Sequence, residues 1–116
     1  MRFEARELKP PAEPVSADEL REGEVYFSVQ FADEKLCVPI VEPLVFVGRN
    51  LDEGDTDLLY FQKFESHSTG VRYTSAEGNS EDFEARGPDE IKHIFEFERA
   101  LDVLLRCSLR RQGVWR

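Results

Sequence analysis

The sequence predicts a single α+β domain, in which an antiparallel, strongly curved β-meander of about five to seven strands is covered by one C-terminal α-helix. Three observations predict this class: the length of 116 residues, a series of short apolar segments between polar turns, and a long amphipathic segment near the C-terminal end. A chain of this length divided in two would leave each half too small a core, so we expect one domain over residues 1–116. A sheet that closes into a small barrel is an alternative within the same class.

Residues 1–15 are expected to form an extended N-terminal arm, because Pro10 and the prolines that follow it exclude a helix. Ser16 and Glu19 have the spacing of a capping box, which predicts a single helical turn. Gly23 is expected to end this turn.

Residues 24–86 are expected to form the sheet. Val25–Phe31 is the clearest strand, because its odd positions are apolar and face the core while its even positions face solvent, with Tyr26 at the boundary. A polar turn leads to a partner strand at Leu36–Val38. Leu44–Val47 is continuously apolar, which predicts a strand near the middle of the fold that is covered on both faces.

Prolines and turn residues divide the remaining β region. Ile40-Val41 lies between Pro39 and Pro43, so we expect a bend or a sheet edge there. After a long loop, Leu58–Phe64 is expected as a strand. A loop over residues 66–70 then leads to a short hairpin of two segments joined by a turn at residues 76–80. These segments are Val71–Tyr73 and Phe83–Arg86.

Residues 88–112 are expected to form the C-terminal helix, which Pro88 and two acidic residues open and Gly113 ends. We expect its main apolar arc to pack on the sheet, with Val103 and Cys107 in a second, weaker strip. This arc consists of Ile91, Ile94, Phe97, Leu101, Leu104, Leu105 and Leu109. A monomer is the favoured state, and a homodimer through this helix is the alternative.

The net charge of −9, from 15 Lys and Arg against 24 Asp and Glu, argues against binding to nucleic acid or to anionic membranes. No segment has the length of apolar sequence that spans a membrane, and the N-terminus lacks the apolar core of a signal peptide. The two cysteines, Cys37 and Cys107, are 70 positions apart and form no Cys-x-x-Cys motif. These features favour a cytoplasmic protein with free thiols over one with a Cys37–Cys107 disulfide.

The acidic charge is concentrated between residues 51 and 87, where nine acidic side chains accompany three basic ones. The densest cluster consists of Asp52, Glu53, Asp55 and Asp57. Gly54 comes too early for a calcium loop of the helix–loop–helix type, so we expect no metal and no cofactor. The cluster therefore predicts a non-catalytic interaction or regulatory domain that binds a basic protein partner, with these four residues as the contact.

Two alternatives to this function are open. In the first, Tyr26, Tyr60 and Tyr73 line a groove of a small-ligand-binding β-domain. In the second, the chain is a small enzyme with His67 or His93 as acid–base residue. The sequence contains no phosphate-binding loop, no dinucleotide fingerprint, no zinc-protease motif and no nucleophile elbow, so catalysis is the least favoured of the three functions.

Overall fold

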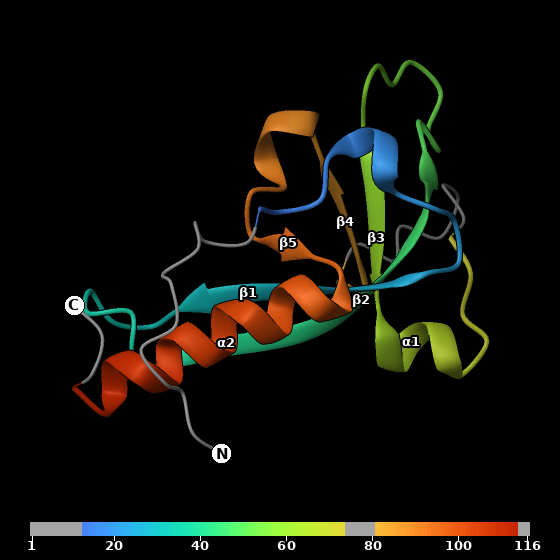
Figure 1. Ribbon diagram of the computed structural model, residues 1–116. Helices are drawn as coiled ribbons and strands as arrows, with labels where there is room; N and C mark the ends of the chain where they lie inside the picture. The colour runs from blue at the N-terminus through green and yellow to red at the C-terminus, as the bar shows by residue number, and fades with distance from the viewer. Residues whose placement is uncertain (1–12, 74–80, 114–116) are drawn as a thin grey trace.

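Five strands form one antiparallel sheet, and one long helix packs on it at the C-terminal end (Figure 1). The computed structural model describes residues 13–73 and 81–113, so residues 1–12 of the predicted arm (1–15) and the predicted turn at residues 76–80 lie outside the described chain. The elements are η1 (Ala17–Glu19), β1 (Val25–Phe31), β2 (Pro39–Arg49), β3 (Leu59–Lys63), α1 (Phe64–Ser68), β4 (Phe83–Arg86), η2 (Pro88–Glu90), β5 (Ile94–Phe95) and α2 (Phe97–Arg111).

The strands lie in the order β4-β3-β2-β1-β5. The first four strands follow the chain as a meander, and β5 joins the sheet beside β1. Because the order has two different end strands, the sheet in the described residues is open and does not close into the barrel that was the alternative prediction. The α+β class with an antiparallel sheet and a C-terminal helix is confirmed.

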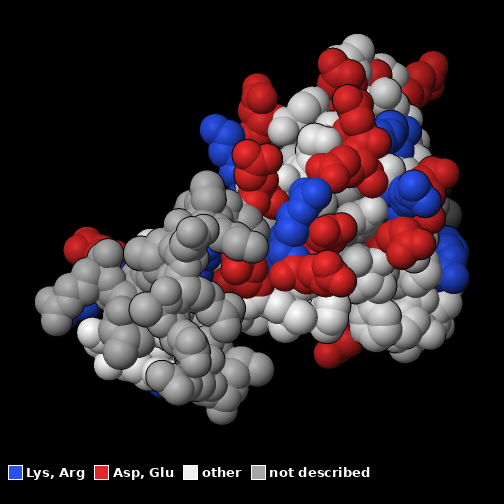
Figure 2. Space-filling view, in the orientation of Figure 1, with Lys and Arg blue, Asp and Glu red and all other residues white. Residues whose placement is uncertain are grey.

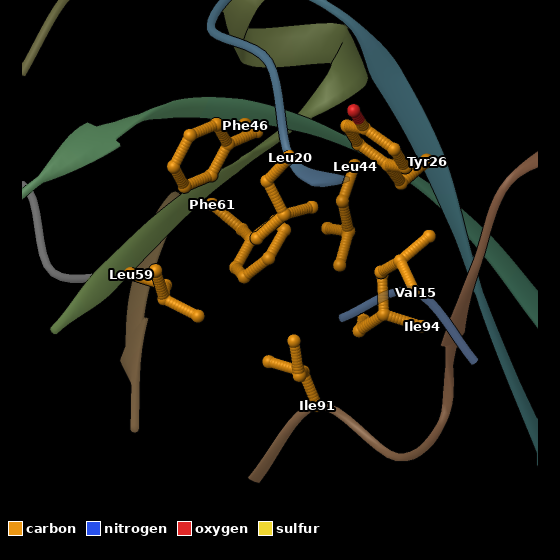
Figure 3. Packing of buried hydrophobic residues seen from close by; sticks show 9 residues of the cluster. All are labelled: Val15, Leu20, Tyr26, Leu44, Phe46, Leu59, Phe61, Ile91 and Ile94. Carbon is orange, nitrogen blue, oxygen red and sulfur yellow. The ribbon is translucent and has the colours of Figure 1, made fainter. Parts of the chain in front are cut away.

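The sheet carries a hydrophobic core on each face, because successive side chains of a strand point to opposite faces. The smaller core lies under α2 (Figure 1). There Val29 and Phe95 pack against Ala100. The larger core is covered by residues 15–20 and by Ile91 (Figure 3). This larger core consists of Val15, Leu20, Tyr26, Leu44, Phe46, Leu59, Phe61, Ile91 and Ile94.

The prediction for β1 is correct in its position but only partly correct in its exposure. Its odd positions Phe27, Val29 and Phe31 do pack under α2. The opposite face is covered at Tyr26 and Ser28, which are 6% and 8% exposed, whereas Gln30 is exposed as predicted. The predicted turn at Ser16–Glu19 is confirmed as η1, where the Ser16 backbone N–H donates to Glu19 Oε1 at 2.9 Å.

β2 is longer than predicted. It is one continuous strand from Pro39, so the expected separate strand at Leu36–Val38 is wrong, and these residues belong to the turn before β2. Asp33 holds this turn, since its carboxylate accepts the N–H groups of Cys37 and Val38, each at 2.9 Å. The predicted buried strand at Leu44–Val47 is confirmed as the middle of β2, which is the central strand of the sheet.

A β-bulge at Phe46 and Gly48 interrupts the pairing of β2 with β3. Gly48 has φ +150, and a Cβ there would lie 2.9 Å from Leu51 Cδ2. The positive φ favours glycine at this position, and a Cβ would also displace the end of the Leu51 side chain. The side chain of Leu51, in the following loop, lies close to Gly48.

The region after β3 differs from the prediction. β3 ends at Lys63, and residues Phe64–Ser68 form the short helix α1 in place of a strand end and a loop. Val71–Tyr73 is not a strand, so it does not form a hairpin with β4, which pairs with β3 instead. The reason is that Gln62 is fully buried and donates from Nε2 to Ser66 Oγ at 2.7 Å and to the Val71 carbonyl at 2.9 Å. These bonds hold Ser66 and Val71 beside Gln62 of β3, so the chain between them forms α1 and a turn.

The C-terminal helix is shorter than the predicted range of 88–112. Residues before Phe97 form the turn η2 and the strand β5, in which Ile94 is fully buried. The Gly87 N–H donates to Glu90 Oε1 at 2.7 Å, so the residues expected to open the helix close a single turn. In the described ranges no helix has the length and apolar composition needed to cross a membrane.

Candidate functional site

The acidic segment forms the loop between β2 and β3. Asn50 closes it, because its N–H donates to the Leu58 carbonyl and its Oδ1 accepts the Leu58 N–H, both at 2.9 Å. Asn50 and Asp57 adopt positive φ angles of 50° and 52°. Asn and Asp tolerate this conformation better than most residues, which explains why this sequence forms a tight loop at the hairpin end.

Two of the four predicted carboxylates point into the loop. Asp55 Oδ2 accepts the Asp52 N–H at 3.0 Å, and the Asp52 carbonyl accepts the Asp55 N–H at 3.2 Å. The Tyr60 hydroxyl donates to Asp55 and lies 3.4 Å from Asp52 Oδ2. Asp52 and Asp55 therefore hold the loop against β3, and their charges are directed toward the protein.

Tyr60 is the residue that joins the loop to the sheet. Its side chain is 5% exposed, and burial, together with the hydrogen bond to Asp55, raises its pKa above the usual range. Its ring contacts Tyr73 with a centroid separation of 5.1 Å. Tyr73 in turn contacts Phe83 of β4 at 5.2 Å. Tyr60, Tyr73 and Phe83 thus form a short row of aromatic rings, and Tyr60 connects this row to the acidic loop.

The other two predicted carboxylates, Glu53 and Asp57, are exposed. No described residue makes an ion pair with either of them. The loop therefore presents two acidic side chains to solvent, half the number that the sequence predicted.

The structure does not bring the three tyrosines of the ligand-binding alternative together. Tyr26 lies in the core on the opposite face of the sheet from Tyr60. Its hydroxyl accepts the Arg21 N–H at 2.9 Å and donates to the Glu19 carbonyl at 3.5 Å, so it anchors η1. Tyr26 and Tyr60 are also poorly placed to bind a ligand, because they are 6% and 5% exposed.

A second acidic site, which the sequence did not reveal, is a shallow groove of about 190 Å³ near the end of β3. Its floor is apolar and its rim carries four carboxylates and one ammonium group. The lining residues are Glu42, Leu44, Phe61, Lys63, Glu81, Asp82, Phe83 and Glu84.

The register of the sheet creates this groove. Leu44 pairs with Lys63 and Phe61 pairs with Glu84, which places these side chains on one face of three adjacent strands. Glu42 precedes Leu44 by two positions, and Asp82 precedes Glu84 by two, so they extend the same face at either side. The alternation of acids at 82 and 84 was visible in the sequence, but the pairing with β3 and β2 was not.

The chemistry of the groove suits a long cationic side chain. The carboxylates at the rim can accept charged hydrogen bonds from Lys or Arg. The apolar residues behind them, Leu44, Phe61 and Phe83, are buried and shape the groove without offering much contact surface. Among the eight lining residues Lys63 is the one cation, and Glu84 also pairs with Arg86 at 2.9 Å. The groove is therefore acidic but already partly neutralised.

The two histidines of the enzyme alternative lie in different parts of the fold, His67 in α1 and His93 just before β5. The serines on either side of His67 bond elsewhere, since Ser66 Oγ accepts from Gln62 and Ser68 Oγ donates to the Glu65 carbonyl. Burial lowers the pKa of His93, and nearby Arg86 lowers it further. His93 contributes its backbone carbonyl to the sheet, where it accepts the Val29 N–H at 2.9 Å.

Cys37 and Cys107 are not bridged; Cys37 is half-buried in the turn before β2, and Cys107 is buried in α2. Over residues 13–73 and 81–113, no group of three or more His, Cys, Asp or Glu side chains is arranged to hold a metal ion. Comparison of the chain with protein-family models, with curated proteins and with solved structures finds no significant match.

Proposed function

We propose that the chain is a non-catalytic interaction domain that binds a basic partner protein through the acidic surface of β2, β3, β4 and the loop before β3. The observation that carries this proposal is the groove of β2–β4, in which acidic side chains surround an apolar floor. Figure 2 shows acidic side chains spread widely over one face of the molecule, with fewer basic ones between them. A basic surface with protruding Arg or Lys side chains is the complementary partner.

The affinity of such a contact would depend strongly on salt. Each exposed ion pair contributes only about 0.2–1 kcal/mol, so several pairs must form together. The charge of the acidic face would act mainly on the rate of association, which falls as salt screens it. Glu53 and Asp57 lie at the opposite end of β3 from the groove, so they would extend the contact rather than form its centre.

The test uses a fluorescently labelled octa-arginine peptide as probe, with binding measured by anisotropy at low, physiological and high NaCl. The native chain should bind at low salt and lose affinity as salt increases. The groove variant Glu42→Gln/Asp82→Asn/Glu84→Gln should weaken binding several-fold. The loop variant Glu53→Gln/Asp57→Asn should weaken it less.

A charge-matched control separates a site from overall acidity. Glu34→Gln/Asp89→Asn/Glu98→Gln also removes three negative charges, but from exposed positions outside the groove. This control should bind the peptide nearly as well as the native chain does. Equal losses in the control and in the groove variant, or an affinity that does not respond to salt, would refute the proposal.

A further inference from the structure

The first half of β2 is an open edge of the sheet. β1 pairs with β2 over Pro39–Val45, whereas β3 pairs with it only from Leu44 onward. Within residues 13–73 and 81–113, positions 39–43 therefore have a strand on one side and no strand on the other. Apolar side chains are exposed along this edge, since Val38 and Ile40 are each 53% exposed and Val41 is 43% exposed.

Two hydrogen bonds show which residues of this edge point outward. The Ala32 N–H donates to the Val38 carbonyl at 2.9 Å, and the Phe46 N–H donates to the Glu24 carbonyl at 3.1 Å. In an antiparallel pair, residues that bond across the pair alternate with residues whose N–H and C=O point to the other side. The even positions of β2 therefore bond to β1, and the odd positions 39, 41 and 43 point to the open side.

Two of these three outward positions are prolines. Proline has no N–H, so Pro39 and Pro43 remove no hydrogen bond from the β1–β2 ladder, but they remove donors from the open side. Val41 supplies the one outward N–H between them. The prolines thus lie at positions where the hydrogen bonds between β1 and β2 stay intact. An added strand on the open side would find only one of the three N–H donors there.

We propose that Pro39 and Pro43 keep this chain from pairing with a second copy of itself along the open edge of β2. Two such edges, aligned antiparallel about Val41, would place residue 39 of one copy opposite residue 43 of the other. Three outward residues on each copy would offer six N–H donors, and the two prolines on each copy remove four of these. The run Val38–Val41 is otherwise β-branched and apolar, the composition that favours edge-to-edge association.

The other free edges are protected by different means. β5 has only two residues, and the Ile94 carbonyl accepts the Val15 N–H at 2.9 Å. β4 has four residues and carries the ion pair of Glu84 and Arg86. Short length, coverage and charge are common protections of sheet edges. The β2 edge is longer and more apolar than either, and proline is its protection.

The test is the double variant Pro39→Thr/Pro43→Thr, which restores an N–H at both positions with a residue that favours strands. Sedimentation velocity over a rising concentration series should show its mass increasing from the 13.4 kDa of one chain towards twice that value. The native chain should not show this increase through β2. Pro88→Thr, in the exposed turn η2, is the matched proline control and should behave as the native chain does.

A third variant links the association to this edge. Adding Val41→Lys to the double variant places a charge at the centre of the paired edges and should restore the native mass. A folded double variant that keeps the mass of one chain at the highest concentration would overturn the proposal. So would association of the double variant that Val41→Lys leaves unchanged.

Hydrogen exchange in the native chain tests the same geometry without a substitution. The Val41 amide points to the open side and should exchange quickly, whereas the Ile40 and Glu42 amides bond to β1 and should exchange slowly. If the double variant does not fold, this measurement decides alone. A Val41 amide as protected as its two neighbours would show that the edge is already covered, and would overturn the proposal.

Discussion

Tyr60 makes two contacts that the sequence presents as separate features. Its hydroxyl bonds to Asp55 of the acidic loop and its ring packs on Tyr73. The sequence placed Tyr60 and Asp55 in two competing functional hypotheses, because it does not show that the loop folds back on β3. In the structure both residues take part in holding the acidic loop against β3.

The ionisation of Tyr60 should therefore limit stability at alkaline pH. Its folded pKa is raised above the unfolded value near 10, first by burial and then by Asp55. The folded state then holds this proton more tightly than the unfolded state does. Stability is retained below about pH 10 and falls as the pH rises above it. Absorbance titration should show Tyr60 ionising only as the chain unfolds.

Tyr60→Phe is the control for that prediction. It removes the titrating hydroxyl while the ring contact with Tyr73 is kept. The variant should be less stable near neutral pH by about 1 kcal/mol, the usual contribution of one hydrogen bond. Its further loss of stability above pH 10 should be smaller than that of the native chain, and an unchanged alkaline loss would contradict the assignment to Tyr60.

β5 and α2 are the elements in which the sequence and the structure differ most. Ile91, Ile94, Phe97 and Leu101 have helical spacing, so the periodicity predicted one helix with all four on its buried face. In the structure Ile94 belongs to β5, which pairs with β1, while Phe97 and Leu101 are 59% and 49% exposed. Apolar residues spaced three or four positions apart also occur by chance in short segments. Ile94 lies in a strand because it pairs with the edge of β1, and this pairing cannot be read from the spacing.

This difference can be measured with two matched truncations. Ile94→Ala should cost about 2–5 kcal/mol of unfolding free energy, because Ile94 is fully buried in the larger core. Leu101→Ala should cost less than about 1 kcal/mol, since half of the side chain is already in solvent. Urea denaturation of both variants gives the comparison. Similar costs would support the single helix of the sequence prediction.

β1 and the middle of β2 were more predictable than the helix boundary, for a physical reason. β1 and the middle of β2 follow from local composition, because a strand covered on one or both faces leaves a clear pattern of apolar residues. The groove at Glu42 and Glu84 depends on the register of β2, β3 and β4, and register is a property of pairs of strands. Of the acidic sites, only the loop could therefore be located from the sequence.

At the scale of the whole molecule, the net negative charge also acts on the stability of the folded chain. A net charge of −9 means that the acidic side chains repel one another in the folded state, which lowers its stability. Ion pairs on the described surface oppose this effect, among them Arg99 with Glu19 at 3.1 Å and Arg106 with Asp102 at 3.0 Å. Arg99 and the Ser16 N–H lower the pKa of Glu19 to about 2, so this pair persists well into acid.

Salt screens both the attraction within ion pairs and the repulsion among the acidic side chains. The direction in which the Tm changes with salt therefore shows which of the two effects is larger. Exposed ion pairs contribute about 0.2–1 kcal/mol each, whereas the repulsion involves all 24 acidic side chains over distances that reach about 30 Å at 0.01 M salt and about 8 Å at 0.15 M. The repulsion should outweigh the ion pairs, so the Tm should rise between these two salt concentrations. The control Glu34→Gln/Asp89→Asn/Glu98→Gln reduces the net charge and should show a smaller rise. A Tm that falls with salt in the native chain would mean that the ion pairs, not the acidic surface, dominate its electrostatics.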